Sequence, residues 1–127
     1  MKTGEICRDS ESVLFARAAR PQGALERMRG LLGRDGLDED EALLIEPCSS
    51  VHTIGMSFPI DLAFLDRRGQ VRKTVRALRP GRMAGCLGAR STLEMQSGSI
   101  DRLRLAKGDT LIWRDGDSAA VSPGVKS

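Results

Sequence analysis

The sequence predicts an α+β fold: a compact, mostly antiparallel sheet, curved or barrel-like, with one main helix at about residues 21–32 and one short helix at about 98–104. Two observations lead to this class. Apolar runs of strand length outnumber the stretches in which apolar residues recur at helical spacing. The clearest pair of such runs is joined by turn residues, which makes the two strands antiparallel neighbours.

The first third of the chain predicts two strands and the main helix. Residues 4–8 and 12–19 are runs of strand length. Pro21 suits the first turn of a helix, where a missing amide proton costs nothing, and Gly33 ends the pattern. Between them, the apolar residues at helical spacing are Leu25, Met28 and Leu32.

The middle of the chain predicts a buried strand and a hairpin. An acidic loop at residues 35–41 leads into an apolar strand at 42–46, which a proline ends. A second apolar run at 60–65 is followed by Asp-Arg-Arg-Gly at 66–69, where glycine accepts the positive φ of a turn. The chain should then return as the partner strand over residues 70–78.

The last third predicts a loop and two further strands. Residues 79–90 contain glycines, a proline and no apolar period, so we expect an irregular loop. A strand at 92–96 precedes the short helix, which Ser97 or Ser99 would cap. A final strand at 110–114 closes the sheet.

Length and composition favour one folded domain. A chain of 127 residues, 40% of them hydrophobic and 29% charged, has the composition of an ordinary globular protein. We expect residues 1–115 to form a single domain. Residues 116–127 are Gly, Ser, Ala and Pro-rich and offer little to bury, so a flexible tail is expected there.

Charge and targeting signals narrow the classes of protein. The formal net charge is +3 and the pI is near 9.1, which by themselves do not indicate a nucleic-acid partner. No apolar run approaches the roughly twenty residues of a membrane span. The first residues lack an unbroken apolar segment that would direct export, so a cytoplasmic location with three free thiols is expected.

Rare side chains gather just after the buried strand. Cys48, His52 and Met56 are spaced four residues apart and could share one face. Thiolate, imidazole and thioether are ligands for a soft ion, and Cys86 could add a fourth. However, there is no Cys-x-x-Cys pair, and Cys and Met are also ordinary core residues. We therefore predict no metal and no other cofactor.

A nucleophilic interpretation uses the same residues. Cys48 would be the nucleophile, His52 its base, and Asp61 would orient the imidazole. Closeness in sequence does not support such a triad, because catalytic residues need only be adjacent in space. The sequence therefore favours a non-enzymatic protein, and a thiol- or metal-dependent enzyme centred on Cys48 and His52 is the alternative.

Basic residues dominate one stretch of the chain. Residues 67–90 hold eight cations and no acid. If Arg72 and Arg76 share the outer face of a strand, they form a basic stripe that could meet phosphate or an acidic protein. Nucleic-acid binding is not expected, because the stretch has no aromatic residues on which bases could stack. We expect a solvated face paired with the acidic residues at 38–41.

Four blocks, in order and spacing, resemble a known family. They lie at residues 29–34, at 51–61, at Leu93-Glu94 with Gly98, and at 107–109. Together they are similar to the prokaryotic family known as domain of unknown function 192, over about residues 15–113. The resemblance implies a compact, strand-rich single domain, and it brings no accepted reaction, substrate or catalytic residue.

The function predicted from these observations is that of a binding or accessory module, which recognises an anionic small molecule or an acidic segment of a partner. Its groove would lie between the family block at residues 51–61 and the glycine-rich loop around Arg82, within residues 79–90. His52 and Arg82 would supply polar contacts, Met56 and Phe58 would line the floor, and Asp61 would orient His52 or Arg82.

Overall fold

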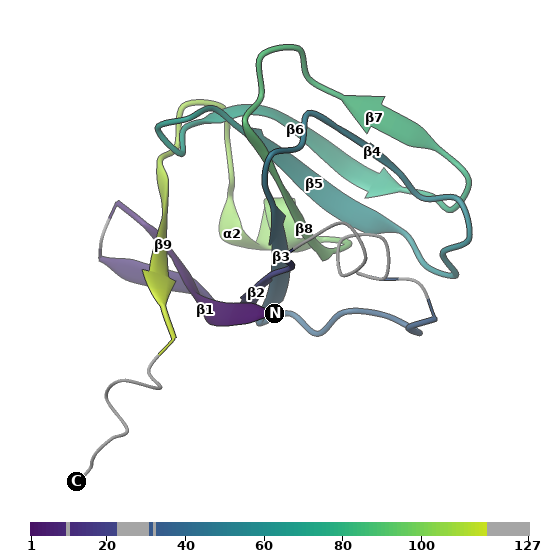
Figure 1. The fold of residues 1–127 in the computed structure, drawn as a ribbon, viewed down its shortest axis with the longest axis horizontal. Coiled ribbons are helices and arrows are strands. Elements are labelled where there is room, and N and C mark those ends of the chain that lie inside the picture. Colours follow the sequence, from purple (N-terminus) through teal and green to yellow (C-terminus); the bar gives the residue numbers. More distant parts are fainter. Residues whose placement is uncertain (10, 23–30, 32, 117–127) are drawn as a thin grey trace, which may run out of the picture.

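The structure is a computed structural model that describes residues 1–9, 11–22, 31 and 33–116. Within these residues the chain forms nine strands and one short helix (Figure 1). The elements are β1 (Lys2–Arg8), β2 (Ser12–Arg20), β3 (Glu41–Ile45), β4 (Ser50–His52), β5 (Ile60–Leu65), β6 (Val71–Leu78), β7 (Met83–Gly85), β8 (Ser91–Gln96), α2 (Ser99–Leu103) and β9 (Leu111–Asp115). No described helix has the length and hydropathy of a membrane span.

The prediction of an α+β fold is wrong, because the described residues are mostly strand and their one helix has five residues. The main helix expected at 21–32 falls largely on residues 23–30 and 32, which lie outside the described residues. Seven strands form one sheet in the order β6-β5-β8-β3-β2-β1-β9. The sheet is mixed, since β2 and β3 pair in parallel across the long connection over residues 21–40. No local pattern in the sequence marks such a pairing.

The sheet is curved, but it is not a closed barrel. Its edge strands β6 and β9 approach each other at one bridge, between Gln70 and Thr110. Beside this bridge, the Val71 amide donates to the Asp109 carbonyl and the Leu111 amide donates to the Gly69 carbonyl, both at 2.8 Å. The contact is confined to the first residues of both strands, so the two edges are pinned at one end only.

Two cores occupy opposite faces of the large sheet. The first core includes Ile6, Phe15, Leu44, Ala63, Leu93, Met95 and Ile100. The second core includes Leu43, Ile45, Val51, Ile60, Leu62 and Phe64. Because side chains alternate along a strand, β3 and β5 contribute to both cores in turn and are apolar at almost every position. This explains the continuous apolar runs in the sequence.

The hairpin predicted in the middle of the chain is confirmed. β5 pairs antiparallel with β6, and the connection is a tight turn. The Asp66 amide donates to the Gln70 carbonyl, and the Gly69 amide donates to the Asp66 carbonyl, each at 3.0 Å. Gly69 has the positive φ of 83° that the turn requires.

A small second sheet covers the second core. β4 pairs antiparallel with β7, and we call residues 50–54 and 83–87 together the flap. Val51 and Ala84, which are directly opposite each other, pack against the second core. Figure 1 shows the flap at the upper right, beside β5 and β6. The prediction of an irregular loop at 79–90 is therefore wrong for Met83–Gly85, because a three-residue strand is too short to show a period.

We expect Gly69→Ala to destabilise the protein by about 2–4 kcal/mol. A Cβ at this position would meet the Leu111 carbonyl oxygen, which is backbone and cannot swing away, and the positive φ adds strain. Urea unfolding measures the loss. Gly81→Ala is the matched control, because Gly81 has a similar φ of 77° but no atom within 4 Å of the added Cβ. Equal losses of stability in both variants would show that the contact between the sheet edges contributes nothing to the free energy of unfolding.

Candidate functional site

His52 lies on the outer side of the flap, and Arg82 is exposed just before β7. His52 is the last residue of β4 and pairs with Met83 on β7, and Arg82 immediately precedes that strand. Both side chains are exposed. Since Val51 and Ala84 face the second core, the adjacent His52–Met83 pair must face away from it. The structure therefore brings these two predicted residues close together along the backbone, but on an open surface.

Thr53 fixes the glycine-rich loop to the segment that carries His52. Its side chain is fully buried, and its hydroxyl donates to the Arg79 carbonyl at 2.6 Å. The same hydroxyl accepts the Arg82 amide at 2.9 Å, and the Thr53 amide donates to the Arg82 carbonyl at 2.8 Å. The two regions proposed to form the groove thus do touch. What joins them is a buried threonine that the sequence did not single out.

Asp61 has a different role from the one expected. Its side chain is only 1% exposed, on β5. One carboxylate oxygen accepts the Ala77 amide at 2.8 Å, and the other accepts the amides of Gly98 at 3.1 Å and Ile100 at 2.9 Å. Both oxygens are thus used by main-chain donors of β6 and of the start of α2. The structure gives this carboxylate a role in the fold rather than in orienting His52 or Arg82.

The remaining predicted residues pack against the second core. Met56, Phe58, Cys48 and Cys86 are all partly buried there. The Cys48 thiol donates to the Ser50 carbonyl at 3.2 Å, and all three cysteines are free thiols. Within the described ranges, no group of three or more His, Cys, Asp or Glu side chains gathers as it would around a metal ion. Cys48, His52 and Cys86 therefore do not form such a group.

Glu94 is a carboxyl group in apolar surroundings. It lies on β8, directly opposite Leu43 of β3 and Leu62 of β5, so it faces the second core. Its side chain is partly buried, and desolvation raises the pKa of this carboxyl from 4.5 to about 7. In the sequence, Glu94 stands out only as part of the Leu93-Glu94 family block. The alternation along β8 could have placed it on an apolar face.

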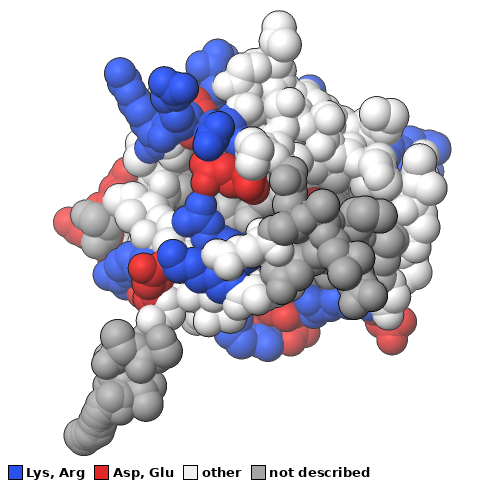
Figure 2. All heavy atoms as spheres, in the orientation of Figure 1, with Lys and Arg blue, Asp and Glu red and all other residues white. Residues whose placement is uncertain are grey.

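The densest cluster of cations surrounds a pocket between two loops. The β5–β6 turn meets the loop that follows β7, where the Arg90 amide donates to the Leu65 carbonyl at 2.7 Å. The pocket between them has a volume of about 640 Å³. We call it the arginine pocket; it is lined by Arg67, Arg68, Arg72, Arg90, Asp66, Gln70 and residues 88–89. Figure 2 shows basic side chains gathered at the upper left, on the side of this turn in Figure 1.

The charge of the arginine pocket is positive. Four arginines and one aspartate line it, which leaves three net positive charges. The Asp66 carboxylate accepts the amides of Gln70 at 3.0 Å and Arg68 at 2.9 Å, and these bonds hold its pKa below the usual value. The Arg90 guanidinium also forms an ion pair with the Glu46 carboxylate, at 3.4 Å. In the described part of the chain, Arg67, Arg68 and Arg72 form no ion pair, so their guanidinium groups remain available to an anion.

The expected pairing of the basic stretch with the acidic loop is wrong. Within the described residues, the acidic loop is paired with arginines from elsewhere. Arg17 bonds to Asp38 and Asp40, each at 2.7 Å, and Arg34 bonds to Glu41 at 2.8 Å. Arg17 lies on β2 directly opposite Glu41 at the start of β3, and Arg34 lies in the same connection as the acidic loop, so both are close to it. The basic stretch is thus left without that partner.

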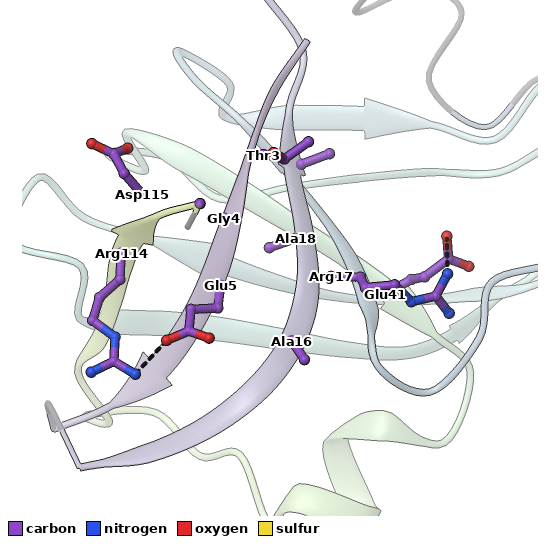
Figure 3. A pocket seen from close by; sticks show the side chains of 11 residues that line it. Thr3, Gly4, Glu5, Ala16, Arg17, Ala18, Glu41, Arg114 and Asp115 are labelled. Carbon is purple, nitrogen blue, oxygen red and sulfur yellow. Dashed lines mark hydrogen bonds and ion pairs between the residues drawn. The ribbon is translucent and has the colours of Figure 1, made fainter. Parts of the chain in front are cut away.

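A second pocket, of about 800 Å³, crosses β1, β2, β3 and β9 (Figure 3). Its floor is formed by small residues, among them Gly4 and Ala18. Its two arginines face carboxylates: Arg114 pairs with Glu5, and Arg17 lies 3.9 Å from Glu41. Because Asp115 adds a third acid, this lining is not cationic. Electrostatics therefore favour the arginine pocket for an anion.

The sequence profile of domain of unknown function 192, described as an uncharacterised ACR, matches residues 8–113. The chain belongs to this family. The resemblance carried by the four sequence blocks is thus confirmed. Members of DUF192 are described as uncharacterised, so the family brings no activity to these residues.

Two solved structures resemble this DUF192 domain. A protein from Sinorhizobium meliloti 1021, described as a proposed transcription regulator, superposes with a TM-score of 0.75 at 18% identity, covering 88% of this chain and 92% of that chain. A protein of unknown function from Novosphingobium aromaticivorans DSM 12444 gives 0.74 at 20% identity, covering 87% and 85%. At such identities the likeness shows the fold alone. No curated protein matches the sequence.

We expect Asp61→Asn to cost about 2–4 kcal/mol of stability. Only one of the two terminal atoms of an asparagine amide can accept a hydrogen bond, so at least one of the three main-chain donors would lose its partner. Urea unfolding measures the change. Asp38→Asn serves as the control, because Asp38 is an exposed aspartate in a surface ion pair and should cost under about 1 kcal/mol. A loss at Asp61 no larger than that at Asp38 would contradict the structural role.

We expect Glu94→Gln to remove a pH dependence of stability. The raised pKa of Glu94 means that the folded state binds this proton more tightly than the unfolded state. The resulting stability is complete below about pH 4.5 and is lost as the pH rises through about 7. Between about pH 4.5 and pH 7, the free energy of unfolding of the wild type should therefore fall relative to that of Glu94→Gln, by no more than about 3 kcal/mol. Unfolding measured at several pH values checks this, and parallel curves would contradict it.

Proposed function

We propose that this DUF192 domain is a non-enzymatic binding module, and that its anionic ligand binds in the arginine pocket. One observation carries the proposal. Four arginines line a pocket of about 640 Å³, and one oxygen of the single carboxylate that lines it is hydrogen-bonded by the turn. Guanidinium groups bind phosphate and carboxylate in a bidentate manner, so a group of them favours a compact oxyanion.

The pocket holds its cations in a defined arrangement. Arg67 and Arg68 belong to a tight turn closed by Asp66, and Arg72 follows on β6. On the other side, Arg90 is held by its main-chain bond to Leu65 and by the ion pair with Glu46. Because both walls are tied to strands, less conformational freedom is lost on binding than in a mobile loop.

This proposal keeps the predicted ligand class and moves the site. The predicted groove used His52, which lies on the outer side of the flap, and Arg82, which is exposed just before β7. Asp61, which was to orient them, is occupied by main-chain amides. The arginine pocket supplies more positive charge in an open depression, so it explains anion recognition better.

Binding of inorganic pyrophosphate, measured by calorimetry, tests the proposal. We expect Arg68→Gln and Arg72→Gln each to weaken binding by about tenfold, because each removes one charge-assisted contact. Arg114→Gln is the matched control: it removes an exposed arginine from β9 that lines the other pocket, and it should leave binding unchanged. Absence of pyrophosphate binding, or equal losses in the control, would overturn the assignment of this pocket.

A further inference from the structure

The flap exposes three large apolar side chains, and one of them lies next to the arginine pocket. Leu87 is 99% exposed, Met83 is 73% exposed and Ile54 is 61% exposed. Two further large apolar residues, Met1 and Val13, are exposed among the described residues. Three of the five therefore lie on the flap. Exposed apolar residues are common singly, but their concentration on one small element indicates contact with something apolar.

The backbone register explains why these side chains face outward. Val51 and Ala84 use the inner face of the flap to cover the second core. Met83 is one residue before Ala84 and therefore points to the other side. Leu87 lies in the loop after β7, directly before residues 88–90, which line the arginine pocket. Leu87 thus adjoins the arginine pocket, and Met83 and Ile54 extend the exposed apolar surface to the opposite end of the flap.

The same surface concentrates positive charge. Residues 67–90 hold eight Arg and Lys residues and no Asp or Glu. Arg76 pairs with Asp101 of α2 and Arg90 pairs with Glu46, so six of these cations have no acidic partner in the described part of the chain. Lys73 extends from β6 to the flap, where its ammonium donates to the Gly85 carbonyl at 2.7 Å. Figure 2 shows blue side chains at the upper left and a largely white, uncharged surface toward the upper right, where Figure 1 places β4 and β7 of the flap. A matching partner must therefore combine negative charge with an apolar layer.

We propose that the flap and the arginine pocket together bind the surface of a bilayer that contains anionic phospholipids. This rests on the proposed function, because the pocket would bind the phosphate of a lipid headgroup. Leu87, Met83 and Ile54 enter the region between headgroups and acyl chains. Cations next to inserted apolar side chains are the combination that attaches proteins to anionic membranes without spanning them.

A bilayer fits this surface better than a folded partner. A stable interface between two proteins requires a contiguous, closely packed core, whereas these side chains project separately from a narrow two-stranded element. A lipid surface requires no complementary shape and accepts separate apolar side chains. Charge complementarity with the cations at 67–90 then favours anionic lipids over neutral ones.

Flotation of the full chain with lipid vesicles tests the inference. We expect binding to vesicles of phosphatidylcholine mixed with phosphatidylserine, weaker binding in high salt, and little binding to phosphatidylcholine alone. Leu87→Ser and Met83→Ser should each reduce vesicle binding by about tenfold and leave pyrophosphate binding unchanged. Val13→Ser, which removes an exposed valine from β2, is the matched control and should change neither.

The outcomes separate this inference from the proposed function. Pyrophosphate binding without vesicle binding would overturn the membrane inference and leave the anion site standing. Vesicle binding that Leu87→Ser and Met83→Ser do not affect would overturn insertion of the flap. A dimer in light scattering that Leu87→Ser dissociates would assign the apolar residues to a second copy of the chain instead. Failure of both ligands to bind would overturn both proposals.

Discussion

The buried carboxylate of Asp61 is the interaction on which most of the fold depends. A charge at 1% exposure is costly unless donors surround it, and here three main-chain amides do so. Ala77, which provides the first of these amides, has a positive φ of 47°. It lies near the end of the β5–β6 pairing, where the register shifts between Ile60 and Leu62. The other two donors are at the start of α2. One side chain of β5 therefore fixes both a bulge in β6 and the position of the helix.

The placement of the flap follows from a second buried polar group. Thr53 bonds to the main chain at Arg79 and Arg82, so the chain leaving β6 is held where β7 can pair with β4. The pairing places Val51 and Ala84 over the second core and leaves the next pair, His52 and Met83, facing outward. Exposure of apolar side chains on the flap is thus a consequence of covering the core with a sheet only two strands wide.

Local features of the sequence predicted the local parts of this structure. The Asp-x-x-Gly turn was recognisable because its hydrogen bonds join residues at most four apart, and the hairpin followed from it. The partners of Asp61, in contrast, lie 16, 37 and 39 residues away, so no spacing in the sequence could identify them. The arginine pocket was foreseen only as a basic stripe. Its two walls are joined by the main-chain bond from Arg90 to Leu65, which connects two segments that are distant in the sequence.

The mild net charge of the chain conceals a strong separation of charge. Eight of the twenty basic residues and none of the seventeen acidic residues lie between positions 67 and 90. Twelve basic and seventeen acidic residues remain elsewhere, a net charge of −5 against +8 in the stretch. The acidic loop before β3 is paired with Arg17 and Arg34, and among the described residues only Asp101 and Glu46 pair with this stretch, through Arg76 and Arg90. When such a domain approaches an anionic surface, the electrostatic field turns the arginine pocket and the flap toward that surface.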